Sequence, residues 1–203
     1  MKITIVITLF CTYLSNNTLC DYFKRTEIRQ LKNFVENFDS FILNKYKTED
    51  NSLANSYKLF FDEIKRNETE VELIDQSVIH ALKEGFVKLD QDLTNKIWII
   101  SKYREINDST NIQTLINLRH NSHFVYYLQS DKRMEEYCNI IDNSGGISPS
   151  LVVLFLSIQE ELDMNNFEDR LKVVVHYMSL INPLIPKGQI FVPIECSVTS
   201  SIK

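Results

Sequence analysis

The sequence predicts an all-α fold: a single-domain bundle of about seven or eight helices, followed by an extended C-terminal tail. Apolar residues recur at steps of three and four along most of the chain, as they do on one face of a helix. Only four glycines and four prolines occur among 203 residues, whereas strand-rich folds use such residues in their many turns. A content of 44% apolar and 24% charged residues is typical of one globular domain.

Residues 1–20 have the features of a secretory signal peptide. Lys2 gives a basic start, residues 3–14 are apolar, and small residues stand just before Asp21, where a signal peptidase needs them. The alternatives are a buried element or an uncleaved membrane anchor, but the apolar run is short for a bilayer. We therefore expect cleavage before Asp21 and a secreted, extracellular helical domain over residues 21–203.

The mature chain expected from this cleavage is acidic. The full sequence has a net charge of −5, which becomes −6 because only Lys2 is lost. Nucleic acids and anionic membrane surfaces favour clustered basic faces, so the sequence predicts neither as a partner. The longest later apolar run, residues 151–156, has the length of a core segment, and we expect no membrane span after cleavage.

Secretion leads to two predictions about covalent modification. Cys138 and Cys196 are the cysteines of the mature chain, and an even pair in an oxidising compartment is expected to form a disulfide. The alternative is two separate buried thiols. Asn67 and Asn107 each begin an Asn-X-Ser/Thr acceptor triplet for glycosylation, although such triplets also arise by chance in a chain rich in Asn, Ser and Thr.

The first three helices follow from apolar stripes. The first begins at about residue 21 or 26 and ends near residue 46, and the second carries its apolar stripe over residues 53–64. The third begins at a capping box over residues 69–72 and reaches about residue 89. Residues 90–92 either break or bend this helix.

The middle of the chain is also expected to be helical. Apolar spacing predicts helices over residues 93–106 and 112–128, with a polar loop over residues 107–110 between them. Ser130 or Asp131 caps a short helix that follows.

The last two helices have clear start signals. Residues 143–146 (Asn-Ser-Gly-Gly) form a turn, and Ser148-Pro149 then opens a helix that is apolar on most sides and is therefore expected to be surrounded by other helices. Asn165 or Asn166 caps the final helix. Three prolines and a glycine follow residue 182, so the tail over residues 183–203 is expected to be extended, either as an edge strand or lying across the helices.

No short catalytic motif is present, and the sequence predicts no cofactor and no metal. His120 and His123 are the best candidates for metal or acid–base chemistry, because a spacing of three places both on one helical face. Metal sites need three or four ligands, and no nearby residues complete such a set. The pair is therefore interpreted as polar residues near a helix end.

Three aromatic residues suggest a surface that binds a partner. Trp98 lies off the best apolar stripe, and Tyr126 and Tyr127 cannot both face one core. Exposed aromatic side chains are typical of protein-binding surfaces.

The leading hypothesis is a secreted interaction or effector protein that binds an unidentified protein, extracellular or from a host, without catalysis. The alternative is an extracellular carrier whose amphipathic helices enclose a small hydrophobic ligand. A third hypothesis is an enzyme of unrecognised family, with His120 or His123 in a cleft.

Overall fold

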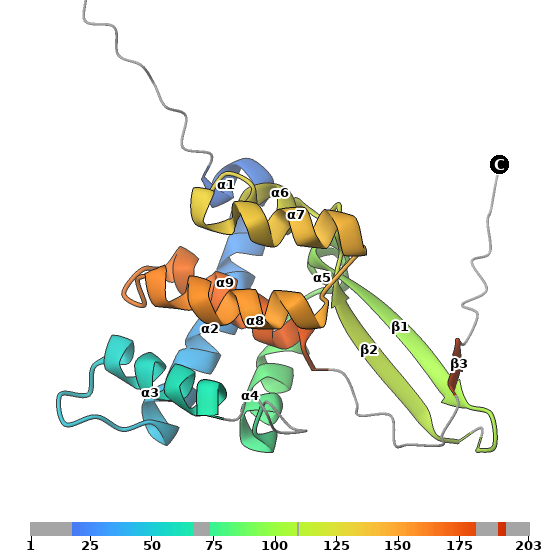
Figure 1. Cartoon of the computed structure of the whole chain (residues 1–203), viewed down its shortest axis with the longest axis horizontal. Coiled ribbons are helices and arrows are strands. Elements are labelled where there is room, and N and C mark those ends of the chain that lie inside the picture. The colour runs from blue at the N-terminus through green and yellow to red at the C-terminus, as the bar shows by residue number, and fades with distance from the viewer. Residues whose placement is uncertain (1–17, 67–73, 109, 182–190, 194–203) are drawn as a thin grey trace, which may run out of the picture.

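The computed structural model describes residues 18–66, 74–108, 110–181 and 191–193. In these ranges nine α-helices form a body from which a small antiparallel sheet projects (Figure 1). The helices are α1 (Leu19–Tyr22), α2 (Arg25–Lys45), α3 (Leu53–Arg66), α4 (Gln76–Phe86), α5 (Gln91–Ile97), α6 (His123–Leu128), α7 (Glu135–Ser144), α8 (Pro149–Ile158) and α9 (Phe167–Ser179). Two 3₁₀ turns, η1 (Lys132–Met134) and η2 (Gln159–Glu161), lie between helices, and the strands are β1 (Trp98–Glu105), β2 (Ile112–Leu118) and β3 (Phe191–Pro193).

The mainly helical prediction is confirmed, but the all-α class is wrong. The predicted helix over residues 93–106 ends with α5 at Ile97, and the chain then continues extended as β1. The predicted helix over residues 112–128 is β2 followed by α6. Both strands are rich in β-branched and aromatic residues, which suit extended backbone, and their period of two was misread as a helical period.

The N-terminal helices agree with the predicted stripes, with one division. Of the two predicted starts of the first helix, the one near residue 26 is confirmed, since α2 begins at Arg25 and α1 is a separate short helix. α3 follows where a second helix was predicted. Leu19 in α1 is only 3% exposed and belongs to the hydrophobic core. Residues 1–17 lie outside the described residues, so the signal peptide stays a prediction. Cleavage before Asp21 would fall inside α1 and would remove Leu19 from the core.

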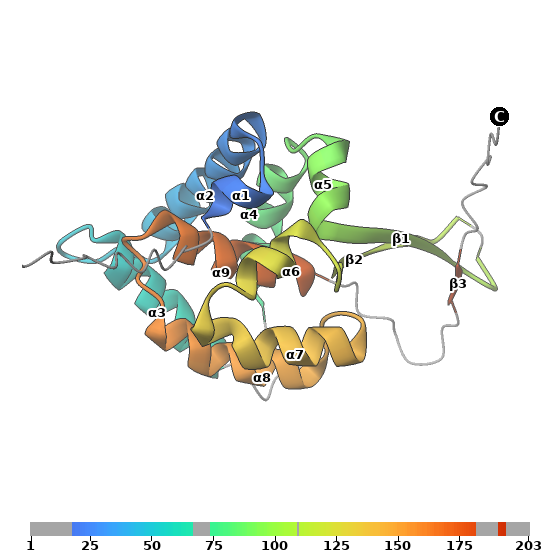
Figure 2. The same cartoon turned by 90° about the horizontal axis from the view of Figure 1, so that it is seen from above.

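Helix α9 is the central helix of the body. Ten of its thirteen residues are buried, and it contacts α2, α4 and β2 (Figures 1 and 2). The prediction that the helix after Pro149 is the surrounded one is wrong, because Val153 of α8 is 57% exposed. Asp169 and Lys172, near the start of α9, are buried because they pair with each other. Charged residues in this segment therefore do not indicate that α9 lies at the centre of the fold.

Most predicted helix ends are confirmed. Asn166 caps α9 by accepting a hydrogen bond from the Glu168 N–H at 2.8 Å, and Gly145 ends α7 in the left-handed region with φ of 74°. Asp131 caps η1, which leads directly into α7. The capping box at residues 69–72 lies outside the described residues, and α4 begins after Asp75.

The C-terminal tail supplies a short edge strand, which is one of the two alternatives predicted for it. β3 pairs antiparallel with β1 through Tyr103, Arg104 and Glu105, giving the strand order β2-β1-β3. The remainder of the predicted extended tail lies outside the described residues. Among the residues that are described, no helix is both long and apolar enough to cross a membrane.

Gly85 sets the distance between α2 and α4, which leads to a prediction. A Cβ at Gly85 would lie 2.6 Å from Cδ2 of Phe34, whose side chain is 2% exposed. We expect Gly85→Ala to lower the free energy of unfolding by about 1–3 kcal/mol, because the core must shift to admit the methyl group. Urea denaturation measures this loss.

Gly146→Ala is the matched control. A Cβ there would meet nothing closer than the Leu118 carbonyl oxygen at 3.6 Å, which is ordinary van der Waals contact. We expect its unfolding free energy to stay within about 0.5 kcal/mol of the original protein. An equal loss in both variants would contradict the close packing of α2 on α4.

Candidate protein-binding surface

The hairpin of β1 and β2 is the element that projects from the helical body (Figures 1 and 2). β1 begins at Trp98, and the hairpin extends well beyond the helices in both views. Its turn is closed by Asp108, which accepts a hydrogen bond from the Thr110 N–H at 3.0 Å and, through its carbonyl oxygen, one from the Asn111 N–H at 3.1 Å. The hydrogen bonds from Thr110 hold the pKa of Asp108 below its ordinary value.

The base of the hairpin is anchored in the core by one large side chain. Trp98 is fully buried, and its ring packs edge-on against Phe34 and Phe86, with ring centroids 6.3 and 5.2 Å apart. Its indole N–H donates to the Ser179 hydroxyl of α9 at 2.9 Å. The buried hydrogen bond satisfies the one polar atom of the side chain. Trp98 therefore fixes the hairpin to the body rather than binding a partner.

The register divides the hairpin residues between two faces. Trp98 pairs with Leu118, Ile100 with Ile116 and Arg104 with Ile112, so these residues share one face. On the opposite face Ile99 pairs with Asn117, Ser101 with Leu115 and Tyr103 with Gln113. Beyond the buried base, each face therefore presents apolar side chains beside polar ones.

Exposed apolar side chains are concentrated on this hairpin. Eight large hydrophobic residues are exposed in the described part of the chain, and four belong to the hairpin and its turn. These four are Ile99 (37%), Ile100 (41%), Ile106 (56%) and Ile112 (53%). The other four, Leu59, Val87, Tyr126 and Val153, lie singly on different helices or at their ends. A concentration of this kind marks an interaction surface more than isolated residues do.

Two of the three aromatic residues expected at the surface are buried. The expectation is wrong for Trp98 and for Tyr127, which is 3% exposed and donates its hydroxyl to Glu168 at 2.8 Å. Tyr126 is 49% exposed on α6, so the inference that these neighbours cannot share one core is confirmed. Trp98 lies off the helical stripe because it begins a strand, where alternate residues point to opposite faces.

The modification sites are described only in part. Among the described residues, Cys20 and Cys138 form no disulfide, and burial raises the pKa of the Cys138 thiol to about 12. Cys196 and Asn67 lie outside the described residues, so the Cys138–Cys196 disulfide and glycosylation at Asn67 stay predictions. Asn107 is exposed in the turn of the hairpin, a position at which a glycan has room.

The two candidate histidines do not share a helical face. His120 lies in the turn before α6 and His123 is the first residue of α6, and both are exposed. The His123 ring contacts Phe23, with ring centroids 6.3 Å apart. In the described ranges no three His, Cys, Asp or Glu side chains are grouped so that they could hold a metal ion.

The charged groups that are most deeply buried pair with one another. Asp169, 2% exposed, accepts hydrogen bonds from Arg133 at 2.8 and 3.0 Å and from the Lys172 ammonium at 2.7 Å. Lys172, 4% exposed, also donates to Asp131 at 2.6 Å. Burial alone would raise the pKa of Asp169, but its bonds to Arg133 and Lys172 outweigh burial and lower it. This cluster joins η1 to α9 and leaves no unpaired group for acid–base chemistry.

His176 of α9 is a second buried titratable group. It is 2% exposed, its ring stacks on Phe155 with centroids 3.7 Å apart, and Nδ1 lies 2.9 Å from the Tyr137 hydroxyl. Burial lowers the pKa of His176 to about 3, so the ring is neutral at physiological pH. A ring held in this way has a structural role, because no substrate reaches it.

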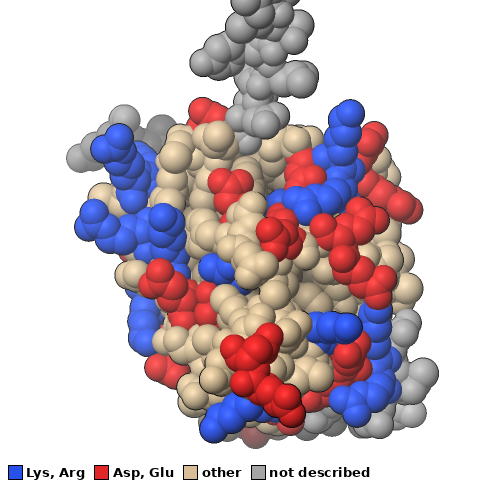
Figure 3. Space-filling view, turned by 90° about the vertical axis from the view of Figure 1, so that its left-hand side faces the viewer, with Lys and Arg blue, Asp and Glu red and all other residues tan. Residues whose placement is uncertain are grey.

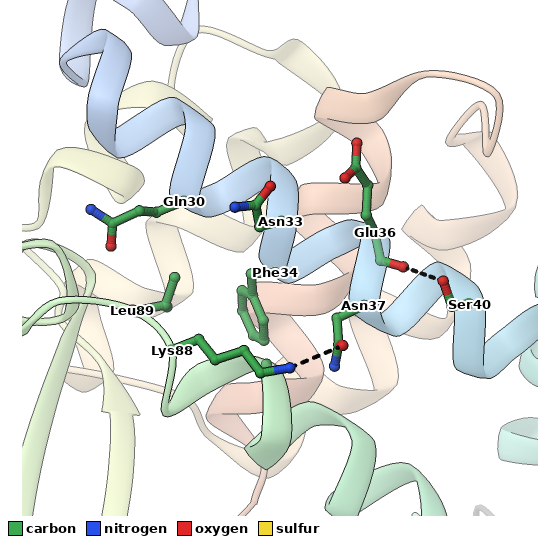
Figure 4. A pocket seen from close by; sticks show the side chains of 9 residues that line it. Gln30, Asn33, Phe34, Glu36, Asn37, Ser40, Lys88 and Leu89 are labelled. Atoms are coloured by element: carbon green, nitrogen blue, oxygen red, sulfur yellow. Dashed lines mark hydrogen bonds between the residues drawn. The ribbon is translucent and has the colours of Figure 1, made fainter.

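Several surface hollows offer space for small molecules, with volumes of about 340–500 Å³. In the groove of Figure 4, residues of α2 face Lys88 and Leu89, and the Lys88 ammonium reaches Asn37 Oδ1 at 3.4 Å. Polar side chains make up most of its lining, so it does not suit an apolar ligand. A more apolar hollow of about 390 Å³ lies between α3 and η2 and includes Phe61, Leu162 and Met164 in its lining.

No known protein family matches this sequence, and the searches of curated proteins and of solved structures found no match either. The structure defines the chain as a mainly helical domain with a projecting antiparallel hairpin.

Proposed function

We propose that this protein is a secreted interaction protein that binds another protein through the projecting hairpin and has no catalytic activity of its own. The observation that carries the proposal is the concentration of exposed isoleucines on an element that extends away from the helical body. Burying such side chains is favourable by about 25 cal/mol per Å² of apolar area. Secretion is supported by the features of residues 1–20.

We place the contact on the face that carries Ile99, whereas Ile100 and Ile112 lie on the opposite face of the hairpin. Ile99, Tyr103 and Leu115 share this face, and each retains exposed surface. An aromatic residue beside aliphatic ones is typical of the centre of a protein interface. By contrast, the side of the body that carries α3 shows interspersed Lys, Arg, Asp and Glu side chains (Figure 3). That side therefore offers no extended basic area for a nucleic acid.

Ile99→Ser tests the proposal against a matched control. Protein from a secretory host is immobilised, exposed to extracellular extracts, and the retained proteins are identified by mass spectrometry and titrated. We expect one saturable partner whose affinity falls about tenfold or more in Ile99→Ser, since a central apolar contact contributes about 1.4 kcal/mol or more. Val153→Ser removes an exposed apolar residue from α8 and is expected to bind normally. Equal effects of both substitutions, or no saturable partner, would contradict the proposal.

The carrier function is the second candidate, and the hollow between α3 and η2 favours it. Gln159 lines this hollow and is 2% exposed, and its side-chain nitrogen has no hydrogen-bond partner in the described structure. A ligand with an apolar body and a hydrogen-bond acceptor would suit such a lining. Native mass spectrometry of the protein purified from a secretory host would then show a bound small molecule. Its absence would leave the interaction function alone.

A further inference from the structure

We propose that the free edge of β2 pairs with β2 of a second copy of this chain, so that the protein forms a two-fold symmetric dimer. The inference uses a different part of the hairpin from the Ile99 face and goes beyond the proposed function. It rests on the open backbone of β2, on its lack of charge and on the complementarity of its two ends.

The outer backbone groups of β2 have no strand partner in the described chain. β2 is the terminal strand in the order β2-β1-β3. Hydrogen bonds from Glu105 N–H to the Asn111 carbonyl and from Arg119 N–H to the Ile97 carbonyl fix which residues face β1. By the alternation of an antiparallel ladder, the N–H and C=O groups of Ile112, Thr114 and Ile116 point away from β1. They form an open edge to which a further strand can add.

The edge of β2 lacks the sequence features that prevent edge strands of different molecules from pairing. The seven residues Ile-Gln-Thr-Leu-Ile-Asn-Leu contain no charge, no proline and no glycine, and their pairing with β1 has no bulge. β1 by contrast carries Lys102, Arg104 and Glu105. Edge strands of soluble proteins usually bear charges or prolines that prevent pairing. Two copies of a chain with a net charge of −5 repel each other, and this electrostatic repulsion is smallest where the contact is made by an uncharged strand.

A pairing centred on Thr114 makes the two copies complementary. Thr114 then lies opposite its own counterpart, and Ile112 lies opposite Ile116 of the second copy, beside Ile100 of that copy. Thr–Thr pairs and pairs of β-branched residues both stabilise antiparallel strands. The exposed Ile112 then gains Ile116 of the second copy as its cross-strand neighbour. Pairing confined to residues 112–116 also avoids the Leu118 carbonyl, which lies against Gly146.

The charges at the two ends of β2 fit this antiparallel arrangement. Glu105 and Asp108 lie at the end where β2 begins, and Arg119 follows its last residue. The Nε of Arg119 is buried without a hydrogen-bond partner, and no acidic side chain pairs with this residue in the described structure. Two-fold pairing brings Arg119 of one copy towards the acidic turn of the other, so both ends of the contact gain opposite charges.

Sedimentation equilibrium of the protein purified from a secretory host, between about 5 μM and about 500 μM, tests the inference, because a short edge contact gives affinities of micromolar order or weaker. We expect a concentration-dependent dimer. Amide exchange at Ile112, Thr114 and Ile116 should slow as the dimer forms, since these amides have no strand partner among the described residues of one chain. A wild-type protein that remains monomeric over this range overturns the inference.

Charge substitutions at Thr114 test the register. Thr114→Lys and Thr114→Asp each place like charges opposite one another, and we expect each to weaken the dimer about tenfold or more. An equimolar mixture of the two variants should dimerise again, because Lys then faces Asp. Val87→Lys adds the same charge at a residue 74% exposed on the body and should leave the dimer unchanged.

The outcomes of the two sets of experiments separate this inference from the proposed function. A dimer that persists in Thr114→Lys, or a mixture that stays monomeric, overturns the β2 pairing. A monomer that still captures an extracellular protein through Ile99 overturns the dimer and leaves the proposed function standing. A dimer that captures no extracellular protein supports the β2 pairing and overturns the proposed function.

Discussion

Asp169→Ala is expected to lower the free energy of unfolding by about 3–5 kcal/mol, because it leaves the buried Lys172 without one of its two carboxylate partners and removes both Asp169 hydrogen bonds of Arg133. Urea denaturation at neutral pH, followed by circular dichroism, measures the loss. The same loss should appear as a lower midpoint with an unchanged slope if the denatured state is unaltered.

An exposed ion pair supplies the control for this prediction. The Lys88 ammonium lies 3.2 Å from Glu84 Oε1, and the side chains of Glu84 and Lys88 are 55% and 59% exposed. Glu84→Ala is expected to cost at most about 0.5 kcal/mol, since water already screens this pair. The double variant Asp169→Leu with Lys172→Met should recover part of the stability by removing both buried charges. A loss below about 1 kcal/mol in Asp169→Ala would show that the cluster does not hold η1 on α9.

Acid is expected to destabilise the protein through His176. The pKa of His176 is about 3 in the folded protein and about 6.5 when the chain unfolds. Between these values the unfolded chain binds a proton that the folded protein excludes. The contribution is therefore complete above pH 6.5 and falls by about 1.4 kcal/mol for each pH unit as the pH drops towards 3. At pH 4.5 the loss reaches about 2.7 kcal/mol.

His176→Asn isolates this effect from that of the carboxylates. Asparagine keeps a polar atom near the Tyr137 hydroxyl and does not titrate in this range. We expect the variant to be less stable at pH 7, because it loses the stacking on Phe155, but to lose about 2.7 kcal/mol less than the original protein between pH 7 and 4.5. Unfolding free energies measured at both pH values check this. Parallel pH profiles would show that the folded protein admits a proton at His176.

The patterns that predicted the helices correctly are those in which local and tertiary requirements agree. The stripe of α2 and the start signals at Ser148-Pro149 and Asn166 depend on residues close in the chain. The hairpin was missed because residues 112–118 also place apolar side chains at helical intervals. Their alternation at Ile112, Ile116 and Leu118, together with β-branched residues and the neighbouring turn at Asp108, was the signal that could have found it.

The candidate surface could not be found by selecting aromatic residues. Trp98 and Tyr127 each have a polar atom that a buried hydrogen bond satisfies, with Ser179 in one case and Glu168 in the other. These partners lie 81 and 41 residues away in the sequence, so no local pattern reveals them. The exposed residues are isoleucines, which sequence reasoning assigns to cores.

The sequence by itself determined a mainly helical domain and most of its helix starts, because capping and periodicity act within a few residues. Only the tertiary structure decided which apolar residues are covered, which helix lies at the centre and where charges such as Lys172 can be buried. Burial depends on contacts between segments far apart in the chain, and the same isoleucine is core or surface according to what packs on it.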